Sequence, residues 1–134
     1  MKNRKYFLAD LLLGIMCVIV VGALAFAISM FREEYSYHYT ADSLYYRLED
    51  EDFGSLVEMY YANEAAGVKA DEDMKEYYGV ARYFEAASYY KLYAQAQDGA
   101  KAEYYQTQME EARKQMGALS FLDEKILEKL GIEE

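Results

Sequence analysis

The residues best suited to chemistry in this sequence are few and far apart. His38 is the only histidine and Cys17 the only cysteine among 134 residues. A Ser-His-Asp arrangement, or a zinc site built from several histidines, has no further histidine to draw on. Cys17 stands inside a long apolar run, and His38 stands in the stretch EYSYHYT, which is typical of a solvated linker. We therefore expect no catalytic residues and no enzymatic activity.

Carboxylates are abundant, but their spacing does not match an ion-binding loop. The runs EDED at 49–52 and DED at 71–73 lack the Asp-x-Asp-x-Asp-Gly spacing and distal glutamate of an EF-hand. Both runs precede predicted helices, where acidic side chains stabilise the helix start. The eight glycines are scattered and form no phosphate-binding loop. The sequence therefore predicts no metal site and no cofactor.

Tyrosine is the residue type that could carry a binding function. Ten of the 16 tyrosines stand in five adjacent pairs. Adjacent residues of a helix lie about 100° apart, so one member of each pair faces inward and the other lies at the edge of the apolar face. The predicted inward members are Tyr45, Tyr60, Tyr77, Tyr90 and Tyr105. The predicted boundary members are Tyr46, Tyr61, Tyr78, Tyr89 and Tyr104.

The boundary tyrosines allow two interpretations. A tyrosine ring packs well while its hydroxyl reaches water, so the pairs could be core and rim of a small helical stack and nothing more. Tyrosine is also enriched at protein interfaces. On that interpretation, the boundary tyrosines gather on one concave surface that binds a partner protein through an extended peptide or a helix.

A long apolar segment near the N-terminus predicts attachment to a membrane. Leu11 to Phe31 contains no charged residue, and as a helix it would be about 31 Å long, which matches a hydrocarbon core of about 30 Å. Three basic residues precede it within residues 1–5, so the positive-inside rule places the N-terminus in the cytoplasm. The predicted parts are a cytoplasmic N-terminus (1–10), a transmembrane helix (11–31), a juxtamembrane linker (32–40) and an extracytoplasmic domain (41–134).

Two alternatives to a simple uncleaved anchor stay open. Small residues at 23–25 and 25–27 satisfy the pattern of a signal-peptide cleavage site, which would release a secreted domain. The apolar run continues to Phe31, past both positions, and this favours an uncleaved helix. The small residues Gly14 and Gly22, eight apart, and Ala23 and Ala27, four apart, could also allow close approach of two membrane helices. A structural protein whose membrane helix pairs in a homo-oligomer is therefore the alternative function.

The segment after the apolar run is strongly acidic. Residues 1–10 hold three basic residues and one acidic residue. Taking them from the totals of 14 and 24 leaves 11 basic and 23 acidic residues in 32–134, a net charge near −12. Such a surface repels nucleic acid, which we exclude as a partner.

The exterior segment is predicted to be all-α. The chain has no proline, helix-forming residues dominate, and no stretch alternates like a half-buried strand. Short connections predict antiparallel neighbours, and two apolar stripes on the third exterior helix predict that it is central. We expect helices from Thr40 or Asp42 to Glu49, from Asp52 to Gly67, from about Asp73 to Gln97, from about Ala100 to Leu119 and from about Leu122 to Leu130.

Residues 52–65, DFGSLVEMYYANEA, carry a resemblance to a known family. Phe53, Leu56 and Tyr60 stand where the second helix of a tetratricopeptide repeat has its aromatic and small or aliphatic residues. The resemblance implies antiparallel helical hairpins that serve as a protein-interaction scaffold. A membrane anchor followed by such hairpins looks like the layout of bacterial accessory subunits at translocons and envelope assemblies.

Overall fold

The computed structural model describes residues 2–34 and 38–132, and the chain divides into two units, 1–37 and 38–134. The structure is 85% helical and has no strand among the described residues. The predicted all-α class is confirmed, because the dominant helix formers and the absence of proline leave nothing to interrupt long helices.

The first unit is one long helix, α1 (Lys2–Glu34). Its segment Leu11–Met30 is long and apolar enough to cross a membrane, and almost all side chains of this segment are exposed. The helix begins well before the apolar run and ends after it. The predicted linker at 32–40 falls partly outside the described residues, since 35–37 are not described.

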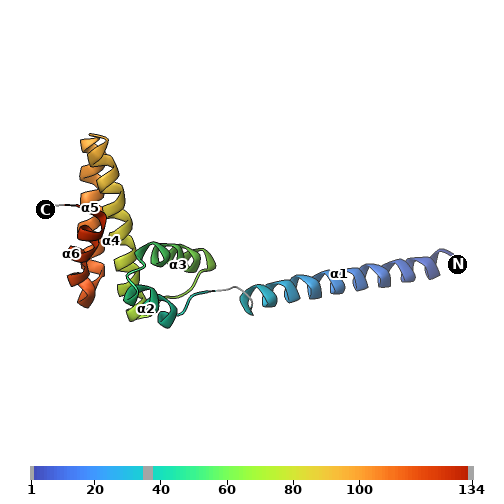
Figure 1. Cartoon of the computed structure of the whole chain (residues 1–134). Coiled ribbons are helices and arrows are strands. Elements are labelled where there is room, and N and C mark those ends of the chain that lie inside the picture. Colours follow the sequence, from blue (N-terminus) through green and yellow to red (C-terminus); the bar gives the residue numbers. More distant parts are fainter. Residues whose placement is uncertain (1, 35–37, 133–134) are drawn as a thin grey trace. The chain divides into compact units, whose positions relative to one another are not determined.

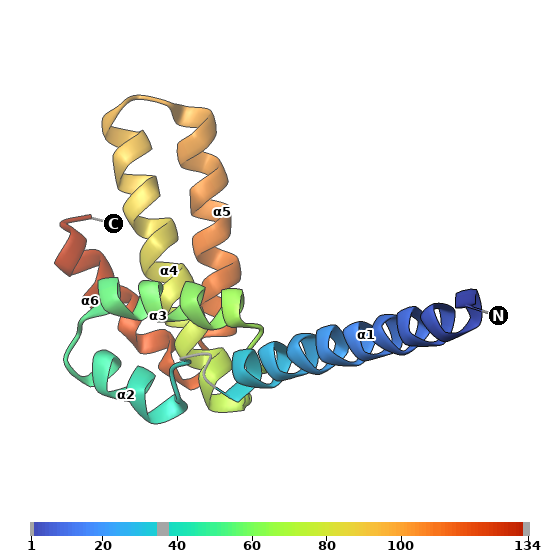
Figure 2. The same ribbon diagram turned by 90° about the vertical axis from the view of Figure 1, so that its right-hand side faces the viewer.

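The second unit is built around a long helical hairpin. Its elements are α2 (Ala41–Glu49), α3 (Phe53–Ala66), α4 (Glu72–Gln95), α5 (Gly99–Gln115), the short 3₁₀ helix η1 (Gly117–Phe121) and α6 (Leu122–Leu130). Helices α4 and α5 run antiparallel, and α3 crosses the lower part of this hairpin (Figures 1 and 2). Helix α4 packs against all the other helices of the unit, so the prediction that it is central is confirmed.

Side-chain caps fix where the helices begin. The side chains of Thr40, Asp52, Asp71 and Asp98 each accept a hydrogen bond from the backbone N–H three residues later. Asp52 and Asp71 belong to the two acidic runs, which therefore act as helix starts. Helix α3 ends at Gly67, as predicted, with the glycine in the left-handed conformation.

The fourth exterior helix is shorter than predicted. It ends at Gln115 and not near Leu119, because Gly117 adopts a φ of 54° and the chain continues as η1. Apolar spacing through Met116 gives no sign of this end. The exact end of a helix depends on local turn chemistry that periodicity does not report.

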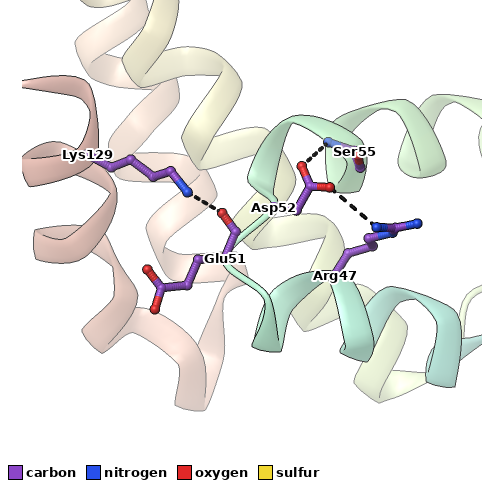
Figure 3. Close-up of polar contacts among 5 residues, drawn as sticks. All are labelled: Arg47, Glu51, Asp52, Ser55 and Lys129. Atoms are coloured by element: carbon purple, nitrogen blue, oxygen red, sulfur yellow. Dashed lines mark hydrogen bonds and ion pairs between the residues drawn. The ribbon is translucent and has the colours of Figure 1, made fainter.

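The acidic turn between α2 and α3 is tied to the C-terminal helix (Figure 3). Lys129 Nζ donates to the carbonyl oxygen of Glu51 at 2.5 Å, and Lys125 Nζ lies 2.5 Å from a Glu51 carboxylate oxygen. Arg47 pairs with Asp52 on the other side of the turn at 3.5 Å. Residues about 75 positions apart in the sequence thus hold one turn.

The core of the second unit lies around α4 and is mostly aliphatic. The completely buried side chains include Leu44, Leu56, Val80 and Ile126 from four helices and Met116 at the C-cap of α5, and Phe53 is 1% exposed. Gly79 lets α4 and α5 approach closely. A Cβ atom at this position would lie 2.6 Å from the backbone nitrogen of Met116. Further along the hairpin, side chains of the two helices also contact each other, as Tyr93 of α4 and Tyr105 of α5 do.

Candidate functional site

Six tyrosines line one groove on the second unit. They come from three helices: Tyr60 and Tyr61 from α3, Tyr89 and Tyr93 from α4, and Tyr104 and Tyr105 from α5. The polar side chains of Arg82, Glu85 and Gln108 complete the lining, and the groove has a volume of about 770 Å³. We call this surface the tyrosine groove.

Helical spacing explains why these side chains meet. Glu85, Tyr89 and Tyr93 follow one another at intervals of four residues, so they share one face of α4. Ala86 lies beside them and is nearly buried, and its small side chain keeps the floor of the groove low. Tyr105 of α5 lies against Tyr89 and Tyr93 on this face. Helix α3 crosses the lower part of the hairpin (Figure 2).

Three tyrosine rings form a stack between α4 and α5. The ring centroids of Tyr89 and Tyr105 are 5.0 Å apart, and those of Tyr93 and Tyr105 are 5.5 Å apart with planes only 6° from parallel. Lys101 places its ammonium nitrogen 4.8 Å from the centroid of the Tyr93 ring, within cation–π range. Lys101 does not line the groove, and its ammonium group also lies 3.6 Å from the Asp98 carboxylate.

A carboxylate and a tyrosine hydroxyl face each other across the groove. The Tyr61 hydroxyl donates to both Glu85 carboxylate oxygens, at 2.9 Å and 2.8 Å. This hydrogen bond, together with burial and the charge of Glu85, raises the pKa of Tyr61 to about 12. Burial also raises the pKa of Tyr60, with a further contribution from the nearby Glu64 carboxylate. At neutral pH the tyrosines are hydroxyl donors and the carboxylate is an acceptor.

The one basic side chain that lines the groove is turned toward α5. Arg82 Nη1 donates to the side-chain oxygen of Gln115 at 2.8 Å. Among residues 38–132, no lysine or arginine nitrogen lies within 4.0 Å of the Glu85 carboxylate. Glu85 thus carries a charge that the tyrosine hydroxyl solvates but that no cation described here neutralises.

The structure brings together three of the five predicted boundary tyrosines. Tyr61, Tyr89 and Tyr104 are all exposed and all line the tyrosine groove. Tyr46 is 64% exposed but does not line it. The prediction missed Tyr93, which is partly buried and belongs to no pair. Its position four residues after Tyr89 was the available signal.

The assignment of Tyr78 to the boundary is wrong, because the structure buries it to 6% exposure. The reason is a polar contact inside the core. Asn63 of α3 is fully buried, and its amide nitrogen donates to the Tyr78 hydroxyl at 2.9 Å and to the Tyr39 carbonyl at 2.8 Å. The Asn63 oxygen accepts from the Tyr39 backbone N–H at 2.7 Å. The Tyr78 hydroxyl thus has a hydrogen-bond partner inside the core, and this allows the tyrosine to be buried.

The assignment of Tyr45 to the inward set is also wrong, since this side chain is 47% exposed. Helix α2 buries Leu44 and Leu48, and Tyr45 lies about 100° away from that stripe. Its ring lies against Tyr77 instead, with centroids 6.4 Å apart. The remaining inward members, Tyr60, Tyr77, Tyr90 and Tyr105, are partly buried.

A second, smaller hollow lies between α5 and α6. It has a volume of about 240 Å³, and its polar feature is an ion pair of 2.5 Å between Arg113 Nε and the mostly buried Asp123. The two charges neutralise each other, so this pair joins two helices and is not itself available to a ligand.

The other side chains that could bind a metal or take part in catalysis do not come together in the described part of the chain. His38 is exposed at the start of the second unit. Within the described part of the chain, no three side chains of the types His, Cys, Asp or Glu come together as a metal-ligand set. The tyrosine groove is therefore the surface on which a function can be argued.

Comparison of the chain with protein-family models, with curated proteins and with solved structures finds no match.

Proposed function

We propose that this chain is a single-pass membrane protein whose acidic exterior domain binds a segment of a partner protein in the tyrosine groove. In this proposal α1 crosses the cell membrane with its N-terminus in the cytoplasm, and the helical domain lies outside the cytoplasm. The protein is an accessory or scaffold subunit and has no catalytic activity.

One observation carries the proposal. Tyr61, Tyr89 and Tyr104 come from three different helices, yet all three expose their rings to a single groove. Rings that served only to fill the core would be covered. Exposed tyrosines give a large contact area at a small cost in side-chain entropy, which is why they are common anchors at protein interfaces.

The length and form of the groove suit an extended chain or a helix. Its lining runs from Arg82 to Tyr93 along three turns of α4, and it is open on one side. The hydroxyls and the groups at Arg82, Glu85 and Gln108 can hydrogen-bond to a peptide backbone. The resemblance of residues 52–65 to a tetratricopeptide helix implies the same kind of role.

A peptide selection tests the proposal. A library of random 12-residue peptides displayed on phage is selected against the full chain in maltoside micelles, and enriched peptides are synthesised. Their affinities are then measured for the wild type and for two variants, Tyr104→Ser and Tyr46→Ser. The two tyrosines are similarly exposed, at 57% and 64%, and each makes an edge contact with its pair partner. Only Tyr104 lines the groove.

We expect Tyr104→Ser to weaken binding about tenfold and Tyr46→Ser to change it less than twofold, because removing one interface tyrosine costs on the order of 1–2 kcal/mol. Equal effects of the two variants would contradict the proposal. So would a selection that enriches no peptide in spite of an intact fold, as judged by the near-ultraviolet circular dichroism of the tyrosines.

A further inference from the structure

We propose that the tyrosine groove receives an arginine side chain of the partner segment, whose guanidinium binds the Glu85 carboxylate and packs against a tyrosine ring. This inference rests on the proposed function and adds the chemistry of the partner.

The negative charge of Glu85 is the first observation that favours an arginine side chain as the ligand. Both carboxylate oxygens face the Tyr61 hydroxyl, but one hydroxyl has a single proton to share between them. Each oxygen keeps lone pairs for further donors, and no described lysine or arginine nitrogen lies within ion-pair distance. Because the Tyr61 hydroxyl lies almost equally close to both oxygens, it takes the place between them, and a guanidinium would donate to the outer lone pairs of one oxygen.

The tyrosine rings near Glu85 are the second observation that favours an arginine side chain. Outside the groove lining, Lys101 places its ammonium nitrogen 4.8 Å from the Tyr93 ring while it pairs with Asp98, which shows that a tyrosine ring of this domain can contact a cation. Tyr89 and Tyr61 line the groove together with Glu85, and both side chains are partly exposed although their rings also pack on Tyr105 and Tyr60. A cation at Glu85 would therefore lie among tyrosine rings as well as beside a carboxylate. Guanidinium stacks on aromatic rings and is less strongly hydrated than an ammonium group, so arginine fits better than lysine.

Charge complementarity supports the same occupant over longer distances. The segment 32–134 has a net charge near −12. Glu64 lies close enough to Tyr60 to raise its pKa, and so adds negative potential near the groove. A basic partner segment is attracted to such a surface, and an acidic one is repelled.

Arg82 carries a positive charge that would repel an arginine side chain in the groove. Replacing it therefore distinguishes a cationic ligand from an anionic one. Arg82 stands one turn before Glu85 on α4 and also lines the groove. Its guanidinium donates to Gln115 and is held toward α5. If the groove binds a cation, removing the Arg82 charge should help binding or leave it unchanged. If the groove binds an anion, the same change should abolish binding.

The experiment uses the full chain in maltoside micelles and the synthetic peptides from the selection. Each peptide is compared with a version in which every arginine is replaced by citrulline, which keeps the shape and removes the charge. The protein variants are Glu85→Gln, Arg82→Gln and the matched control Glu128→Gln. Glu128 is exposed on α6, outside the groove, so its replacement changes the net charge by the same amount as Glu85→Gln. Glutamine at 85 can still accept the Tyr61 hydrogen bond, which protects the fold.

We expect the enriched peptides to contain arginine, and citrulline to weaken their binding about tenfold. Glu85→Gln should weaken the arginine peptides by a similar factor and leave the citrulline peptides almost unchanged. Glu128→Gln should alter the affinity less than twofold, and Arg82→Gln should not weaken it.

Three results would overturn the inference, and they are separable from failure of the proposed function. Peptides whose binding depends on Tyr104 but not on arginine or Glu85 would leave the groove as a binding site and remove its preference for a cation. Loss of binding in Arg82→Gln would show that the groove takes an anionic ligand. Peptides whose binding does not depend on Tyr104 would remove the proposed function itself, and this inference with it.

Discussion

Helices α4 and α5 approach each other closely at Gly79, and this contact can be tested by replacing the glycine with alanine. Gly79 is buried in the middle of α4, one turn below the first groove residue. A Cβ atom there would lie 2.6 Å from Met116 N, 2.7 Å from Gln115 C and 2.9 Å from Gln115 O. All three atoms belong to the backbone of α5 or its C-cap, so no side-chain rotation relieves the clash.

Two opposing effects set the magnitude. Alanine in a helix interior is favoured over glycine by about 1 kcal/mol. Overpacking of a well-packed contact costs about 1–3 kcal/mol, and a clash with backbone belongs near the upper end. Gly79→Ala should therefore destabilise the second unit by about 1–2 kcal/mol. Gly54 in α3 is the control, because its Cβ would meet nothing within 4 Å, and Gly54→Ala should stabilise by up to about 1 kcal/mol.

The measurement is urea unfolding of the full chain in maltoside micelles, followed by the near-ultraviolet circular dichroism of the tyrosines. This signal reports side-chain packing in the second unit, whereas far-ultraviolet signals would include α1 in the micelle. The chain has no tryptophan to obscure it. If Gly79→Ala were as stable as Gly54→Ala, or more so, the helices would not approach as described and the groove geometry would be wrong.

Three further predictions concern the buried amide, the tyrosine hydroxyls and the membrane topology. Asn63→Ala removes the hydrogen bonds of the Asn63 amide to the Tyr39 backbone and to the buried Tyr78 hydroxyl, and should cost about 2–4 kcal/mol in urea unfolding; a cost below about 1 kcal/mol would show that water replaces the amide. The pKa of Tyr61 is raised to about 12, so its neutral form stabilises the fold below pH 10, and this contribution is lost as the pH rises from about 10 through about 12. The pKa values of Tyr60, Tyr77, Tyr78 and Tyr105 are also raised, so titration at 295 nm is compared between variants. Tyr61→Phe should remove the component that titrates near pH 12, and Glu85→Gln should shift it to lower pH; an unchanged curve would contradict the contact. In a cysteine-free background, an impermeant maleimide added to intact cells should label Glu128→Cys and not Asn3→Cys, and the reverse pattern would contradict the topology.

Much of the fold follows from local sequence because its causes are local. An apolar run without charges specifies a helix as long as a bilayer is thick, whatever the rest of the chain does. Asp52 begins α3 and Gly67 ends it through contacts within three or four residues. Such signals can be read along the chain, and they predicted the exterior helices, apart from the early end of α5, and the exposure of Tyr46, Tyr61, Tyr89 and Tyr104.

The groove itself was decided only by tertiary structure. Its lining comes from three separate segments, and their meeting depends on the crossing of α3 and on the close approach at Gly79. Helical periodicity alone assigns both Tyr78 and Tyr89 to the edge of the apolar face of their helix. One is buried against Asn63 of another helix and the other opens to the groove. Helical periodicity tells which residues share a face, but which neighbour covers that face depends on packing between residues far apart in the chain.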